Sequence, residues 1–279
     1  LQGYLTQRGV ISSEMAWRGM FLIGTLPALL TLVIMRRLKE PERWQAVAGK
    51  ASAGQRLRAY VGELFGNPRW ARNAVVGLLL ASSGIIGLWG IGFFSIDLQR
   101  TVFRERFQTL GLSEEQLNGM VSFWAGVTSL MMNVGAFFGI YAFSYLAHFI
   151  GRKWSFALAF VLALLSTVLV FSSFRTIADV FWMIPLMGFC QLALFGGYAI
   201  YFPELFPTRL RSTGITFCYN GARFVAAIGP TMLGLLTNRV YSGYPEPMRY
   251  AGVTMCAIFL VGLAVLPFAP ETKGQPLPE

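Results

Sequence analysis

The sequence predicts an all-α membrane protein with seven transmembrane helices. Of its 279 residues, 55% are hydrophobic and only 13% are charged, whereas about a quarter of the residues in soluble proteins are charged. The charges are clustered, so long apolar stretches remain, and a stretch of roughly 18 residues or more is long enough to span a bilayer as a helix. These predicted spans lie at about 17–35, 74–96, 120–147, 154–174, 180–202, 212–237 and 249–269.

The spacing of the spans predicts the domain organisation. One span stands alone, a polar and basic linker follows at 36–73, and six closely spaced spans then occupy 74–269. A twelve-span transporter made of two six-helix halves would look like this after losing its first five spans. We therefore expect residues 1–35 to be the end of an N-terminal half, 74–269 to be a six-helix C-terminal bundle, and 270–279 to be a tail.

The distribution of charge predicts the orientation in the membrane. The linker carries nine basic residues against three acids, so the positive-inside rule assigns it to the cytoplasm. Alternation of the spans then predicts an N-terminus outside, a cytoplasmic C-terminus and a multi-pass protein of a plasma membrane of the bacterial inner-membrane type. The net charge of +10 follows from these loops and does not indicate nucleic acid binding. The basic linker residues are Arg36, Arg37, Lys39, Arg43, Lys50, Arg56, Arg58, Arg69 and Arg72.

Local signals predict where individual helices begin, bend and pack. Ser113 with Gln116 forms a capping-box pattern, and Asn67 before a proline marks a break ahead of the second span. A short surface helix is expected around 55–65, and a loop at 97–119. The pair Gly135 and Gly139 favours close helix packing. Prolines inside spans predict kinks, at Pro27, Pro185 and Pro230, whereas a helix is expected to stop at Pro203 and Pro207.

Arg223 is the clearest functional candidate, because charged side chains are costly inside a membrane. It lies about eleven residues into its span, which corresponds to a depth of roughly 16 Å. Tyr219 and Asn220 lie on the same helix face as Arg223. Two interpretations remain open: a structural arginine paired with carbonyls or an acid, and an anchor for a carboxylate or polar substrate.

Other polar or aromatic side chains near the middle of spans are candidates for the lining of a substrate cavity. They are Gln191, Tyr198, Asn133 and Trp89, and each could equally serve only in interhelical hydrogen bonding or packing. No span contains Asp or Glu. The three cysteines, Cys190, Cys218 and Cys256, lie in apolar runs and indicate packing rather than a disulfide or a metal site. We expect no cofactor, no metal and no enzymatic activity.

A cluster of charges follows the fifth span of the bundle, in the stretch YFPELFPTRLRSTG at 201–214. Glu204 there needs a cation, and the candidates are Arg211 in the same turn and Arg152 or Lys153 in the preceding basic loop. Arg209 and the single histidine, His148, lie in the same end region. A purely topological role, as a positive-inside anchor, is the alternative.

The motifs around these residues resemble those of the major facilitator superfamily. PELFPTRLRSTG resembles the signature that closes the tenth span in its sugar-porter and metabolite:proton-symporter branches. PETKG at 270–274 resembles its C-terminal motif, and WRGMFLIGTLPALL at 17–30 followed by EPERW is similar to its sixth span. FCYNGAR at 217–223 is similar to the eleventh span of the lactate and sialic acid carriers.

This resemblance implies a secondary active transporter that works by alternating access. It implies proton-coupled uptake of a small organic acid or sugar acid, with a neutral sugar porter as the alternative. Its partners would be the substrate, the proton, the lipid bilayer and a missing N-terminal half. The family loop Asp-Arg-x-Gly-Arg-Arg corresponds to residues 148–153, where His148 and Phe149 replace its first two residues. The resemblance implies a cytoplasmic gating network of this loop with Glu204, Arg209 and Arg211. A seven-helix receptor and a non-transporting scaffold are further, less favoured classes.

Overall fold

The computed structural model describes residues 13–37 and 53–278, in two compact units that divide between Arg56 and Leu57. In the first unit the structure describes helix α2, Ser13–Arg37, which contains Pro27 and includes the span predicted at 17–35, and the first four residues of helix α4, Ala53–Gly66. The remainder of the predicted linker, at 38–52, lies outside the described residues.

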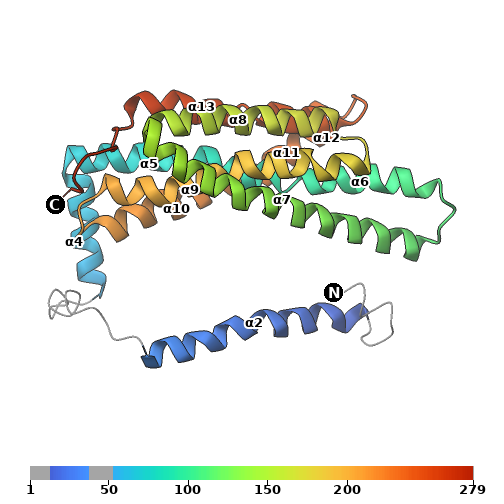
Figure 1. Cartoon of the computed structure of the whole chain (residues 1–279), viewed down its shortest axis with the longest axis horizontal. Helices are drawn as coiled ribbons and strands as arrows, with labels where there is room; N and C mark the ends of the chain where they lie inside the picture. The colour runs from blue at the N-terminus through green and yellow to red at the C-terminus, as the bar shows by residue number, and fades with distance from the viewer. Residues whose placement is uncertain (1–12, 38–52, 279) are drawn as a thin grey trace. The chain divides into compact units, whose positions relative to one another are not determined.

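The second unit is a helical bundle (Figure 1). No strand occurs in its described residues. Its elements in order are α4 (Ala53–Gly66), α5 (Pro68–Ile85), the π-helical segment η1 (Ile86–Gly92), α6 (Ser95–Gln108), α7 (Glu114–Ile150), α8 (Arg152–Ser173), the 3₁₀ segment η2 (Ile177–Phe181), α9 (Met183–Leu205), α10 (Arg211–Ala226), α11 (Ile228–Leu235), the π-helical segment η3 (Leu236–Val240), α12 (Pro247–Met255), α13 (Ile258–Val265) and the 3₁₀ turn η4 (Leu266–Phe268).

Five stretches of the described residues are long and apolar enough to cross a membrane: Pro68–Gln108, Glu114–Ile150, Arg152–Ser173, Ile177–Leu205 and Pro247–Phe268. They confirm five of the seven predicted spans. The segments predicted at 17–35 and 212–237 are helical but are not among the five. In the second of these segments, Tyr219, Asn220 and Arg223 interrupt the apolar sequence.

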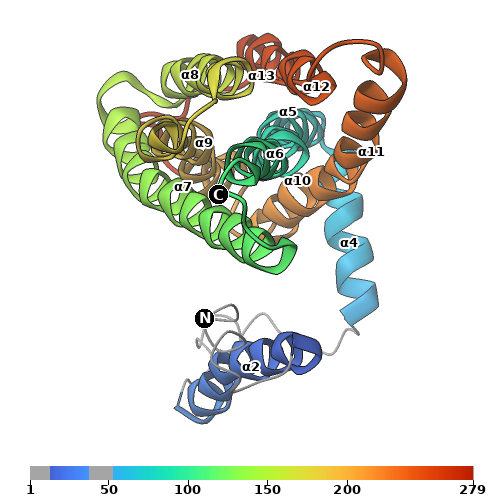
Figure 2. The ribbon, with the colours of Figure 1, turned by 90° about the vertical axis from the view of Figure 1, so that its right-hand side faces the viewer.

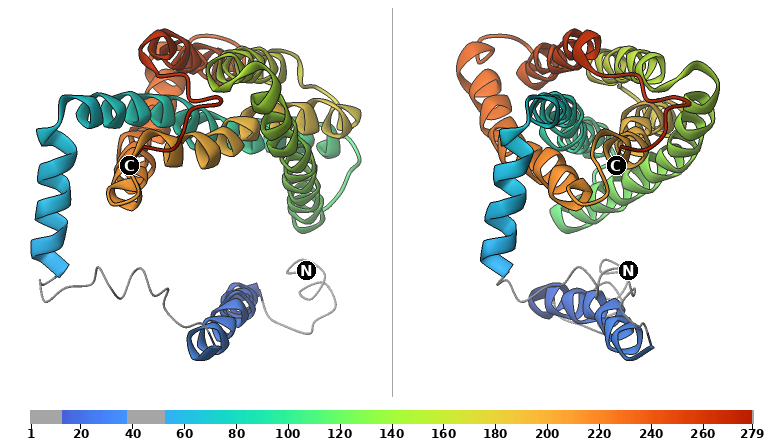
Figure 3. Two further views of the ribbon diagram at one scale, coloured as in Figure 1. Left: turned by 60° about the vertical axis from the view of Figure 1, so that its left-hand side comes forward. Right: turned by 90° about the vertical axis from the view of Figure 1, so that its left-hand side faces the viewer.

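The predicted capping box and the predicted break at Asn67 are confirmed. The Ser113 side chain accepts a hydrogen bond from the Gln116 N–H at 3.3 Å, and the Gln116 side chain accepts one from the Ser113 N–H at 3.1 Å. Asn67 caps α5 by accepting a hydrogen bond from the Arg69 N–H at 2.9 Å. The surface helix predicted around 55–65 is present as α4, which turns sharply away from α5 (Figure 3) and buries Leu64.

The loop predicted at 97–119 is wrong for most of its length, because α6 extends to Gln108. The charged residues of this segment face outward, whereas Leu98, Phe103 and Phe107 are buried. An amphipathic pattern of this kind continues a helix beyond the apolar span. The result is a long hairpin of α6 and α7.

The prolines act differently at their different positions. Pro230 breaks its span as predicted: α10 ends at Ala226, the residue whose carbonyl the proline ring would meet, and α11 begins two residues later. Pro185 lies in the first turn of α9, where proline is tolerated. Pro203 does not end its helix, because α9 continues to Leu205.

Backbone contact between α7 and α9 depends on glycine, as predicted for Gly135 and Gly139. A Cβ atom at Gly135 would collide with the Pro185 carbonyl, and one at Gly139 with the Phe189 carbonyl. Gly188 of α9 meets the Met132 carbonyl of α7 in the same way.

Figure 2, which views the bundle from one end, shows α5 and α6 surrounded by the other helices of the bundle. We call the end where α5 begins the linker end, and the end with the α6–α7 connection the hairpin end.

Candidate functional site

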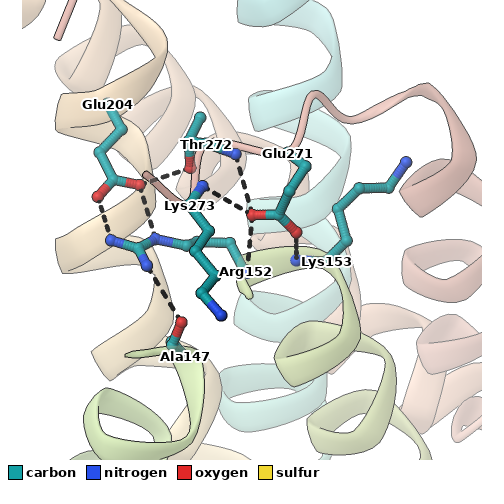
Figure 4. Close-up of polar contacts among 7 residues, drawn as sticks. All are labelled: Ala147, Arg152, Lys153, Glu204, Glu271, Thr272 and Lys273. Atoms are coloured by element: carbon teal, nitrogen blue, oxygen red, sulfur yellow. Dashed lines mark hydrogen bonds and ion pairs between the residues drawn. The ribbon is translucent and has the colours of Figure 1, made fainter. Parts of the chain in front are cut away.

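A pair of opposite charges joins α8 and α9 at the linker end. Glu204 accepts hydrogen bonds from Arg152 at 2.6 Å and 3.0 Å, in the two-pronged arrangement that guanidinium and carboxylate favour (Figure 4). Each side chain is only 17% exposed. The remaining guanidinium nitrogen donates to the Ala147 carbonyl at 3.1 Å, at the end of α7. The pairing of Glu204 with Arg152 predicted from the sequence is therefore present.

The C-terminal tail completes this arrangement. The Thr272 hydroxyl donates to Glu204 at 2.6 Å. The Glu271 carboxylate accepts from the backbone N–H groups of Arg152 at 3.0 Å and Lys153 at 3.1 Å, the first two residues of α8. It also accepts from Lys273 N–H at 2.9 Å. We call Glu204, Arg152, Glu271 and Thr272 the Glu204 cluster.

Glu271 lies where a helix favours negative charge, because unpaired N–H groups and the helix dipole both point toward it. Burial disfavours its charged form, but the backbone hydrogen bonds from Arg152, Lys153, Thr272 and Lys273 outweigh this effect and lower the pKa of Glu271. Gly151 precedes α8 with a φ of 88°, and a Cβ there would approach Glu271 Oε2 to 2.8 Å. A larger residue at Gly151 would thus strain the backbone and displace the carboxylate.

The other residues predicted for the gating network lie around this cluster with different partners. Arg211 donates to the Pro203 carbonyl at 3.0 Å rather than to Glu204. Arg209 forms an ion pair with Glu63 of α4. Lys153 Nζ donates to the Pro267 carbonyl at 3.3 Å, and His148 is exposed with its ring edge-on to Phe149.

Sequence reasoning did not assign Thr272 and Glu271 to this network. Both belong to the PETKG motif, so the signal was present, but a terminal motif does not show which helix ends the tail will contact. Lys273 extends the same contacts, because its ammonium donates to the Phe149 carbonyl at 2.7 Å. The tail therefore connects the ends of α7, α8 and α9.

The second candidate region is an exposed strip on α10. Arg223 is exposed, and its guanidinium lies over the Tyr219 ring at 4.9 Å, a cation–π contact. Asn220 is exposed one turn away, followed toward the linker end by Thr216 and Ser212. Within the described part of the chain, no carboxylate lies within ion-pair distance of Arg223. The acid that a purely structural arginine could pair with is thus not found among the described residues.

Trp89 lies on η1, a segment that contacts α10 and α11. Its ring stacks on Phe93, with 4.6 Å between the centroids and 4° between the planes. Trp89 remains 46% exposed and Phe93 45% exposed, although most of the surrounding helix is buried. Segments of π-helix within α-helices are frequent at functional sites, because the extra residue redirects the side chains.

The structure separates the remaining predicted cavity residues from this strip. Gln191 is 1% exposed, and its amide donates to the Thr167 hydroxyl at 2.6 Å. Tyr198 is also buried, and its hydroxyl donates to the Leu80 carbonyl at 2.7 Å. Asn133 is exposed on α7, and its amide donates to the Ser129 carbonyl of its own helix at 2.8 Å. Gln191 and Tyr198 thus form interhelical hydrogen bonds inside the bundle.

Arg249 is a buried charge that the sequence did not single out. It is 6% exposed and donates to the carbonyls of Phe171 at 3.0 Å and Phe174 at 2.8 Å, at the end of α8. Its third partner is Glu246, at 2.6 Å. This hydrogen bond and the neighbouring positive charges lower the pKa of Glu246. In the sequence Arg249 resembles an ordinary arginine at the start of a span.

Known proteins with similar sequences are membrane transporters. The sequence model of the family described as "Sugar (and other) transporter" matches residues 76–191. A "Putative metabolite transport protein" of Haemophilus influenzae is 27% identical over 95% of this chain and 60% of its own length. The "Probable 4-methylmuconolactone transporter" of Cupriavidus pinatubonensis is 27% identical over 95% of this chain and 56% of its own length.

The "Cis,cis-muconate transport protein" of Acinetobacter baylyi is 22% identical over 90% of this chain and 57% of its own length. The chain thus spans less than two thirds of the length of these relatives. The three relatives match the helices that carry Glu204 and Arg223, whereas the family model ends at residue 191, before both of them. The chain is therefore similar over most of its length to membrane transporters, in agreement with the resemblance of its motifs to the major facilitator superfamily.

Proposed function

We propose that this chain is the C-terminal part of a secondary active transporter that carries a small organic acid by alternating access. The observation that supports the substrate class most directly is Arg223, an exposed arginine in a predicted span. The names of three relatives, which refer to a metabolite, 4-methylmuconolactone and cis,cis-muconate, agree with an organic substrate. The residues predicted to form one half of the substrate site are Arg223, Asn220, Tyr219 and Trp89.

Arg223 has the chemistry that a carboxylate site needs. Its guanidinium stays charged under all physiological conditions and presents parallel N–H donors that match both oxygens of a carboxylate. Tyr219 holds one face of the guanidinium, so its edge remains available. A charge at this depth is tolerated where it faces a water-filled cavity, and the polar strip of Ser212, Thr216 and Asn220 beside it fits such a cavity.

The Glu204 cluster is our candidate for the cytoplasmic gate. We propose that the linker end faces the cytoplasm of a plasma membrane, that the N-terminus lies outside, and that the cluster stabilises one state of the transport cycle. Its bonds connect helix ends that must separate or rotate when access changes. A charge pair that forms in only one state biases the equilibrium between the states by its own free energy.

We also propose that uptake is coupled to protons. No Asp or Glu lies within the predicted spans, so the coupling acid would belong to the additional length that the relatives possess. The neutral sugar porter is the second candidate, and the match to the "Sugar (and other) transporter" family supports it. The two functions differ in what they require of Arg223, because a neutral sugar has no carboxylate to pair with it.

Uptake of radiolabelled acids by cells that express the protein tests the proposal. We expect Arg223→Gln to abolish uptake of a carboxylate and Arg223→Lys to retain a small part of it, because lysine keeps the charge but loses the two-pronged geometry. Arg239→Gln is the matched control, since Arg239 is an exposed arginine just beyond the end of the same predicted span. Carboxylate uptake that survives Arg223→Gln would exclude the anion anchor. Hexose uptake by the same cells would favour the sugar porter.

A further inference from the structure

We infer that the acid bound at Arg223 is planar and unsaturated, and that the Trp89–Phe93 stack binds its hydrocarbon part. This inference rests on the proposed function and specifies the substrate of the same site. It combines a carboxylate anchor on α10 with an exposed aromatic surface on η1. For this, Trp89 and Arg223 must lie close enough for one molecule to contact both.

A contact between two glycines fixes the relation of the helices that carry these side chains. Gly90 of η1 and Gly229 of α11 touch through their backbones, and a Cβ built on Gly229 would lie 2.9 Å from the Gly90 Cα. The α5–η1 and α10–α11 segments both run from the linker end toward the hairpin end (Figure 1), and they cross at an angle (Figure 2). Ala227, between α10 and α11, keeps a right-handed helical conformation. Positions on the two helices can therefore be compared by counting residues from this contact.

The counting places Trp89 and Arg223 on the same side of the helix pair. Trp89 lies one residue before Gly90, and Arg223 lies six residues before Gly229. With about 100° of rotation per residue, both side chains point to the side on which Tyr219 and Phe93 also lie. The exposure of Trp89, Phe93 and Arg223 agrees with this common direction.

The same counting gives the separation along the helices. A difference of five residues corresponds to roughly 7–8 Å at about 1.5 Å per residue. A carboxylate bound to Arg223 can thus have its hydrocarbon part against the Trp89 ring when the molecule is about the length of a six-carbon chain. A much shorter acid would reach only one of the two sites.

The aromatic surface favours a flat partner. The rings of Trp89 and Phe93 are nearly parallel, so each covers one face of the other and about half of each side chain remains exposed. A conjugated or aromatic acid can stack flat on this surface, whereas tetrahedral carbons of a saturated chain contact it with fewer atoms. Aromatic stacking of this kind corresponds to a preference of about two- to tenfold.

Matched pairs of acids test the inference, because the members differ in saturation but keep size and charge. We compare uptake of cis,cis-muconate with adipate, and of benzoate with cyclohexanecarboxylate, in cells that express the protein. We expect the unsaturated member of each pair to be preferred by about two- to tenfold. Trp89→Leu and Phe93→Leu should each reduce this ratio toward one.

Two control variants distinguish the loss of the aromatic surface of Trp89 and Phe93 from a general loss of folded protein. Trp154→Leu removes an exposed tryptophan from α8 and should leave the ratio unchanged, and Trp89→Phe keeps an aromatic ring and should retain the preference. Equal uptake of both members by the wild type, or an unchanged ratio in Trp89→Leu, would overturn the planar-substrate inference. The second result would mean that the stack only contacts lipid or another segment. Uptake of no acid at all would instead overturn the proposed function.

Discussion

Glu204 and Arg152 bind each other through two hydrogen bonds although 52 residues separate them in the chain. This pair joins the end of α9 to the start of α8, and Thr272 of the tail donates to the same carboxylate. A bidentate pair of low exposure is stronger than an ordinary surface ion pair, because its geometry is fixed and little water screens it. The pair is therefore suited to stabilise one arrangement of the helix ends.

Glu204→Gln should lower the maximal transport rate about tenfold, equivalent to about 1.4 kcal/mol, with little change in substrate affinity. The amide keeps the shape of the side chain but loses the charge that holds Arg152. Rate and affinity are measured separately by uptake over a range of substrate concentrations. Glu63→Gln is the control, because its ion pair with Arg209 is more exposed. An unchanged rate in Glu204→Gln would leave the cluster with only a topological role.

Arg249→Ala should destabilise the bundle by about 2–4 kcal/mol, because it leaves the Phe171 and Phe174 carbonyls without their donor. Thermal unfolding in detergent, followed by circular dichroism, measures the effect as a lowered midpoint. Arg239→Ala removes an exposed arginine and should leave the midpoint nearly unchanged. Equal midpoints for the two variants would show that the carbonyls of α8 find other donors.

The contribution of Glu271 should depend on pH. Because its pKa is lowered in the folded protein, the stabilisation is fully present above the ordinary value of 4.5 and is lost as the pH falls through the lowered pKa. The difference in stability between wild type and Glu271→Gln should therefore be largest near neutral pH and shrink below about 4.5. Unfolding midpoints measured from pH 7 to pH 3 check this. A constant difference across that range would contradict it.

Gly139→Ala should destabilise the α7–α9 contact by about 1–3 kcal/mol, because the new methyl group would collide with the Phe189 backbone. Gly126→Ala on the same helix is the matched control, since no atom lies within 4 Å of a Cβ there. It should be neutral or stabilise α7 by about 0.5–1 kcal/mol, as alanine favours helix more than glycine does. Chemical or thermal unfolding of both variants decides between these expectations.

The sequence alone predicted most of the fold, because membrane spans follow from local composition and helix ends follow from local capping residues. It predicted five confirmed spans, the cap at Ser113 and the close packing at Gly135. It did not predict that α6 continues the first span of the bundle, because its charges hide the buried positions of Phe103 and Phe107. Whether Phe103 and Phe107 are buried depends on the direction in which each side chain points around the helix. An average of hydropathy along the sequence contains no information on this direction.

The candidate site was only partly predictable for a related reason. Glu204 and Arg152 could be paired, because both were expected at the same end of the bundle. Gln191 and Tyr198 could not be distinguished from cavity residues, since depth in a span does not show which way a side chain points. Arg249 was missed because its partners in α8 are backbone carbonyls. Every residue has a carbonyl, so no sequence pattern identifies these partners.

Both ends of α8 are held by charges that belong to the last span and its flanks. Glu271 binds the N–H groups where α8 begins, and Arg249 binds the carbonyls where it ends. A helix fixed in this way cannot slide lengthwise along its neighbour without breaking one set of bonds. A rearrangement that separates Glu204 from Arg152 but keeps these two sets of bonds would therefore move α8 and the last span together as one rigid unit.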